Sequence, residues 1–151
     1  MSWATVNTAI KTILSGVSGI GVVMGYDPHA TDWGVRINYF RHTDHTINGW
    51  SFTRSAAPSE RTTIAAVPKD RNTHIVSMVG LYEIAGDGSA TELTFQALVD
   101  AVKEAFRQNK TLGLSGVGAG PVQGDMIHND EFGNVWCHHA ELSMEVWENT
   151  N

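Results

Sequence analysis

Residues 89–148 have the clearest structural pattern in the chain and read SATELTFQALVDAVKEAFRQNKTLGLSGVGAGPVQGDMIHNDEFGNVWCHHAELSMEVWE. The stretch opens with Ser89-Ala90-Thr91-Glu92, which has the spacing of a helix capping box. The residues that follow are apolar at three- and four-residue spacings and polar in between. The apolar positions are Phe95, Leu98, Val99, Val102, Ala105 and Phe106. The pattern predicts an amphipathic helix of about 18 residues that ends near Asn109.

The end of the same stretch predicts a β-hairpin. A glycine-rich link over residues 113–124 is followed by a strand at 122–127, a turn at 129–134 and a long strand from Val135. Two sets alternate along that last strand: Ala140, Leu142, Met144 and Val146 against His139, Glu141, Ser143 and Glu145. We expect the first set to face the core and the second to face solvent or a neighbouring subunit.

Upstream, the chain starts with a second amphipathic pattern. Residues 2–14 are apolar at helical spacing, with Ser2 as a possible N-cap and Gly16 as a stop. Residues 16–25 are β-branched at their centre and predict a strand entered through a glycine-rich turn.

The middle of the chain predicts further strands. Residues 33–39 alternate with period two, and Asn48-Gly49 leads into Trp50 and Phe52, so we expect a hairpin with a long polar connection. Residues 74–84 read as another strand. The predicted fold class is therefore α+β: a single domain over residues 1–151, with a mixed, mostly antiparallel sheet flanked by an N-terminal helix and one longer helix.

Residues 54–73 (RSAAPSERTTIAAVPKDRNT) have neither a helical nor a strand period. The segment contains two prolines and four of the ten basic side chains: Arg54, Arg61, Lys69 and Arg71. Long loops inside compact domains are usually functional or disordered. We predict a long loop that acts as a contact arm, with these four residues at an interface.

Charge is distributed unevenly along the chain. Residues 1–110 hold ten basic and ten acidic side chains, whereas residues 111–151 hold six acidic and no basic ones, for a net charge of −6. Proteins that bind duplex DNA by neutralising phosphates have the opposite bias, so sequence-specific DNA binding is not expected. No apolar run approaches 18 residues and no signal-peptide pattern is present at the N-terminus, so we expect neither a membrane span nor secretion.

No catalytic or cofactor motif emerges from the sequence, and we expect no enzyme activity, no cofactor and no metal. His42-x-x-His45 has ligand-like spacing but only Asp44 nearby. A second group comprises the pair His138-His139 with His128 across the predicted hairpin, but His138 and His139 are adjacent strand residues that point to opposite faces and cannot readily chelate one ion. The glycine runs 16–21 and 116–120 lack the context of a phosphate-binding loop.

The only cysteine, Cys137, lies in a strand-like segment beside His138. Neighbouring strand side chains diverge, so the pair lacks the geometry of an activated nucleophile. We expect a buried thiol in a reducing compartment.

Glu141 and Glu145 are separated by about 13 Å along a strand, which is too far for a glycosidase pair.

Residues 89–148 resemble the C-terminal half of the tail-terminator and tail-completion proteins of long-tailed phages, the lambda U protein type, and related prophage and gene-transfer-agent proteins. The resemblance lies in a helix containing Leu98 to Val102 and Asn109, a small-residue link containing Leu112-Gly113, and a final alternating strand from Ala140 to Glu148. It covers about 60 residues closely and the rest in layout, and residues 54–73 match nothing in it.

The resemblance implies a tail-terminator-like domain that works as a homo-oligomeric ring, with six subunits expected. Such a ring caps the tail tube at its head-proximal end, stops its polymerisation and meets the head connector or stopper protein. The protein would then be a virion component, assembled in the host cytoplasm, and DNA would pass through the ring without sequence-specific binding. We expect Asp125, Glu141 and Glu145 to line the lumen, where acidic groups repel the phosphate backbone.

Two alternatives remain open. Another head-tail connector or a tail-tube subunit shares this size and layout. A small enzyme or ligand-binding protein would instead require a cleft with a strongly perturbed titratable group.

Overall fold

Two long antiparallel strands, β4 (Val67–Glu83) and β7 (Val135–Thr150), form the centre of the sheet in this computed structural model, which describes residues 1–64 and 66–150. They pair continuously from Asp70↔Thr150 to Glu83↔Cys137. The other described elements are α1 (Trp3–Ser15), β1 (Val22–Met24), α2 (Trp33–Arg36), the 3-10 helix η1 (Ile37–Phe40), β2 (Asn48–Ala56), β3 (Ser59–Ile64), α3 (Ser89–Gln108), β5 (Val117–Ala119) and β6 (Gln123–Phe132).

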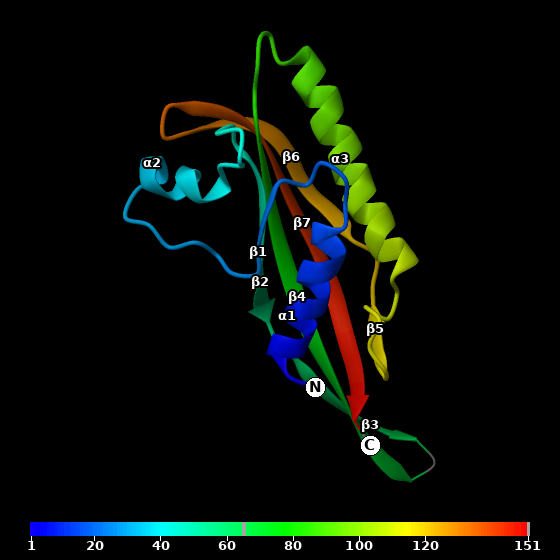
Figure 1. The fold of residues 1–151 in the computed structure, drawn as a ribbon. Helices are drawn as coiled ribbons and strands as arrows, with labels where there is room; N and C mark the ends of the chain where they lie inside the picture. Colours follow the sequence, from blue (N-terminus) through cyan, green and yellow to red (C-terminus); the bar gives the residue numbers. More distant parts are fainter. Residues whose placement is uncertain (65, 151) are drawn as a thin grey trace.

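The sheet has seven strands and is mostly antiparallel. The order is β1-β2-β4-β7-β5, with β3 added to β4 and β6 added to β7, and only β1 and β2 pair in parallel among these strands. Figure 1 shows β4 and β7 running the length of the molecule, with β3 at one end and α2 near the other. The predicted α+β fold, with a mixed sheet, an N-terminal helix and one longer helix, is confirmed.

The main core lies between one face of the sheet and the helices α1 and α3. Ala140, Leu142, Met144 and Val146 of β7 are buried there, as their alternation predicted. α1 contributes Val6, Ile10 and Leu14, and α3 contributes Phe95, Leu98, Val99, Val102 and Phe106. None of the described helices is long and apolar enough to cross a bilayer.

A second, smaller core covers part of the opposite face. Residues 25–47, here called the α2 lobe, place Ile37, Phe40 and Ile47 against Leu81 and Cys137. Burial raises the pKa of the Cys137 thiol to about 12, so it stays protonated at neutral pH, as expected of a buried thiol.

The prediction of a strand over residues 33–39 was wrong, because α2 and η1 form there. Asp32 caps the helix, since its Oδ1 accepts a hydrogen bond from the Val35 amide at 2.9 Å. Ile37 and Phe40 are the buried residues, and their three-residue spacing fits one side of a helical turn. The alternation in the sequence therefore did not reflect a half-buried strand.

The prediction of a long loop over residues 54–73 was also wrong. β3 pairs residue by residue with the start of β4, from Ser59↔Asn72 to Ile64↔Val67, and forms a two-stranded hairpin. We call residues 57–72 the arm. Both of its faces meet solvent at most described positions, so no apolar alternation is needed to form it, and the sequence carries none. Its clearest stabilising contact is the double hydrogen bond from Arg61 to Asp70, at 2.6 and 3.0 Å.

The start of α1 docks at the base of the arm through His74. The His74 side chain is buried, its ring centroid lies 5.8 Å from that of Trp3, and its Nδ1 lies 3.4 Å from Nη1 of Arg54. Burial lowers the pKa of His74, and the positive charge of Arg54 lowers it further, against an opposing effect of Glu148. The folded chain is therefore more stable with the His74 imidazole in its neutral form.

Gly80 should be intolerant of any side chain. It pairs with Trp50, which is fully buried, and a Cβ at Gly80 would lie 2.5–2.7 Å from atoms of the indole ring. Overpacking of this kind costs about 1–3 kcal/mol. We expect Gly80→Ala to lower the free energy of unfolding, measured by urea denaturation, by that amount. The control is Gly120→Ala, where the nearest atoms are 3.5–3.9 Å away; equal losses in both variants would contradict the prediction.

Stability should fall as the pH drops through the ordinary pKa of histidine. Because the pKa of His74 is lower in the folded than in the unfolded chain, the unfolded chain binds the extra proton first, and stability is lost as the pH falls below about 6.5. His74→Gln should make the dependence of the unfolding free energy on pH between 7.5 and 5.5 shallower than in the wild type. His29→Gln, at an exposed position, is the control. Identical slopes for the wild type and His74→Gln would contradict this assignment.

Candidate functional site

Part of one sheet face carries none of the described helices. It lies opposite α1 and α3, beyond the α2 lobe, and we call it the open sheet face. The strand register places four residues side by side in one row across four strands: Thr53, Ser77, Ser143 and Gln123. A second row comprises Ile75 and Glu145. The first row is therefore polar, and the second combines one apolar and one acidic side chain.

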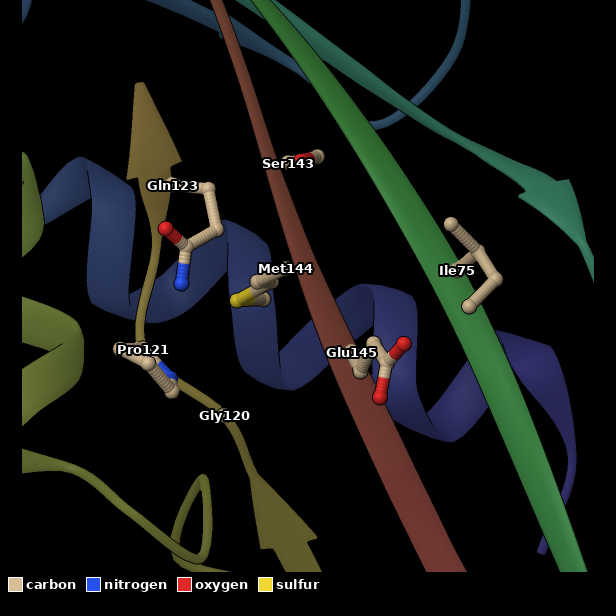
Figure 2. Close-up of a pocket in the computed structure, with 7 residues that line it drawn as sticks. All are labelled: Ile75, Gly120, Pro121, Gln123, Ser143, Met144 and Glu145. Atoms are coloured by element: carbon tan, nitrogen blue, oxygen red, sulfur yellow. The ribbon is translucent and has the colours of Figure 1, made fainter. Parts of the chain in front are cut away.

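A shallow pocket of about 240 Å³ lies on this face, where the edge strand breaks between β5 and β6. Figure 2 shows Gln123, Ser143, Glu145 and Ile75 around it, with α1 behind the sheet. Its walls also include Gly120, Pro121 and Met144. Glu145 is the one ionisable residue among these seven, so the pocket itself brings no acid-base pair together.

The three predicted acidic residues do share this face. Glu141 and Glu145 project from β7 on the same side, and Ser143 lies between them along the strand. The Ser143 hydroxyl donates a hydrogen bond to Oδ1 of Asp125 at 3.1 Å, which places that carboxylate beside the same row. Asp125 and Glu145 are exposed and Glu141 is half-buried. Whether they line a lumen stays a prediction.

The four predicted basic residues are distributed over two places. Arg61, Lys69 and Arg71 lie on the arm, where Arg61 is paired with Asp70 and the guanidinium of Arg71 lies 4.8 Å above the Trp147 ring. Arg54 lies at the base of the arm, 5.6 Å from the Trp3 ring. Their role at an interface likewise stays a prediction.

Sequence reasoning missed an exposed apolar group on the α2 lobe. Tyr26, Trp33, Val35 and Tyr39 are each between 45% and 55% exposed. Arg36 adds a cation 4.6 Å above the Trp33 ring and pairs with Asp27. Aromatic side chains with a nearby arginine are enriched at protein interfaces. The wrong strand prediction hid this group, because it assigned Trp33, Val35 and Tyr39 to a buried face.

His138 and His139 point to opposite faces, as expected of adjacent strand residues. His138 is buried, with Nδ1 2.6 Å from Asn129 Oδ1 and Nε2 2.9 Å from Thr91 Oγ1, so it joins the first turn of α3 to the hairpin. Burial lowers the pKa of His138, against a small opposing effect of Glu92. This histidine has a structural role.

The loop of His42 and His45 is already held by other contacts. Asp44 Oδ1 accepts hydrogen bonds from the Thr46 hydroxyl at 2.7 Å and the Thr46 amide at 3.1 Å, and these bonds lower the pKa of Asp44. The Asp44 carboxylate thus stabilises the turn that contains His42 and His45.

Comparison with known proteins gives little further information. No protein-family model matches the chain, and no curated protein matches it. Among solved structures, the chain is similar to one described as "Virion of native gene transfer agent (GTA) particle", with 12% sequence identity and a TM-score of 0.37 over 97% of this chain and 99% of that chain. A TM-score this low does not establish a shared fold.

Proposed function

We propose that the protein is a non-enzymatic virion structural subunit of the tail-terminator type. In this proposal, copies of the chain form a homo-oligomeric ring, with six as the expected number. The ring caps the head-proximal end of the tail tube, ends its polymerisation and joins it to the head connector or stopper protein. The subunits assemble in the host cytoplasm and remain in the virion.

The observation that carries the proposal is that one chain presents unlike surfaces at its two ends. The arm projects at one end of the sheet, and the α2 lobe with its exposed aromatic residues lies toward the other (Figure 1). Unlike surfaces associate head to tail, and head-to-tail contacts form rings when the rotation between subunits closes. The unlike ends of the chain therefore support the formation of a ring.

The arm is suited to protein contact by its backbone as well as its side chains. Among the described strands β3 pairs only with β4, so its other edge is free to take a further strand. The cations Lys69 and Arg71 share one face of the arm, since both are odd-numbered residues of the same strand. An acidic strand or an acidic surface of a neighbour or of the tube fits this arm.

The open sheet face fits a water-filled channel better than a protein contact. Its first row is polar, and its three carboxylates give it a negative field. In a ring around the DNA path, that field repels phosphates and limits adhesion during ejection. This supports the predicted lumen position of Asp125, Glu141 and Glu145.

A head-tail connector or a tail-tube subunit is the second candidate, because it also needs unlike surfaces and a polar lumen. The place of binding separates the two: a terminator binds one end of a finished tube, a tube subunit is found along its length, and a connector binds the head.

The first experiment is native mass spectrometry of the purified protein with and without tail tubes, followed by negative-stain imaging of the tubes. We expect closed rings at one end of tubes that have stopped at a fixed length. Lys69→Glu should weaken binding to tubes while leaving the unfolding temperature nearly unchanged, because Lys69 lies on the arm. Lys11→Glu, an exposed position on α1, is the matched charge reversal and should bind normally. Particles that associate neither with tubes nor with one another would overturn the proposal.

Neutralising the acidic face should impair DNA passage but not assembly. We expect Glu141→Gln/Glu145→Gln to form rings that cap tubes, yet to lower the rate of DNA delivery in a complementation assay, because the repulsive field is weakened. Glu92→Gln/Asp100→Asn removes the same charge from the exposed side of α3 and serves as the control. An unchanged delivery rate with the first pair, or an equal loss with the second, would count against a lumen position.

A further inference from the structure

Three side chains that commonly bind metals meet on the β6–β7 hairpin. His128 and His139 are direct cross-strand partners, and their ring centroids lie 4.7 Å apart. Asp130 is two residues beyond His128 on β6 and therefore projects from the same face. One possible ligand atom from each of the three lies within 4.8 Å of the other two.

The group has a buried floor and an open side. His139 is only 8% exposed, whereas the side chains of His128 and Asp130 are 34% and 55% exposed. The Nδ1 atoms of both histidines are buried and have no hydrogen-bond partner among the described residues. Buried polar atoms without a partner are uncommon, because each costs free energy. An ion entering from the Asp130 side can reach this group.

The charges around His139 favour a cation. Asp130 supplies one negative charge, and Glu141 supplies another with its Oε1 3.6 Å from Nε2 of His139. Arg36 is the opposing positive charge, and its guanidinium is paired with Asp27.

We propose that His128, Asp130 and His139 form a binding site for one Zn²⁺ ion. Imidazole and carboxylate ligands suit zinc, which binds them at about 2.0–2.2 Å and usually takes four ligands. Three protein ligands leave the fourth position for water or for a group of a partner. At these bond lengths, the ligand atoms of a tetrahedral site lie about 3.5 Å apart. The distances between the three ligand atoms must therefore shorten by roughly 1 Å when zinc binds, and the exposed side chain of Asp130 can move by that amount.

Zinc at this position would join the two strands of the hairpin next to the α2 lobe. His139 also contacts Phe132 edge-on with ring centroids 5.3 Å apart, and Phe132 packs on Trp33 of α2 at 4.8 Å. The ion would therefore stabilise the part of the molecule that carries the exposed aromatic group. The site belongs to the single chain and does not depend on the proposed ring.

The test is titration of the chelator-stripped full chain with zinc chloride, followed by calorimetry, with thermal unfolding recorded in parallel. We expect one ion per chain and a raised unfolding temperature. Asp130→Asn and His128→Asn change partly exposed side chains and should each weaken zinc binding at least about tenfold. Cobalt titration gives a second readout, since the absorption of bound cobalt reports tetrahedral coordination and should be lost in His139→Asn.

His42→Asn/His45→Asn removes the other closely spaced histidine pair and is the matched control, expected to keep wild-type affinity. Saturable binding that survives in Asp130→Asn and His128→Asn but is lost in the control would overturn the proposal. So would the absence of saturable binding to the wild type at millimolar zinc. Neither result bears on ring formation, which is measured on tubes.

Discussion

The pairing of β4 with β7 is the interaction on which the rest of this structure depends. Every other described strand except β1 pairs with one of these two, and β1 reaches them through β2. Because side chains alternate along a strand, the same register assigns Leu142 and Met144 to the core and Ser143 and Glu145 to the open sheet face. A slip of one residue would exchange the two sets, so the burial of one face fixes the register and, with it, the composition of the other.

The sequence predicted the elements that bury one apolar face in the core. α1, α3 and the buried side of β7 each lay one apolar face on the core, and each was predicted close to its observed bounds. The arm was missed because a two-stranded hairpin with solvent on both faces needs no alternation of apolar residues. Residues 33–40 were misread for a related reason: a short, capped helix with Ile37 and Phe40 buried has too few turns to establish a helical period.

The candidate sites were partly predictable. Strand alternation places Glu141 and Glu145 on one face, and their position at a lumen stays a prediction. His128 was considered as a ligand together with His138 and His139 and rejected, because the two adjacent histidines diverge. The combination of His128 with His139 and Asp130 was missed, although the cross-strand pairing has a signal in the sequence. Gly133 and Asn134 both have positive φ, at 55° and 67°, as a two-residue hairpin turn requires. Residues equally distant from that turn face each other, which pairs His128 with His139. The longer turn predicted over residues 129–134 obscured this register.

The polarity of the two free surfaces suggests how subunits should be oriented in an assembly. Covering Thr53, Ser77 and Ser143 with an apolar neighbour would remove hydroxyl groups from water, and each one left without a partner costs about 1–3 kcal/mol. Burying Tyr26, Trp33 and Tyr39 instead contributes free energy, at roughly 25 cal/mol per Å² of apolar surface. Contacts between subunits are therefore favoured at the α2 lobe, and water is favoured at the open sheet face. In the proposed ring, that preference would turn the acidic face toward the channel and leave the aromatic lobe for the neighbouring copy.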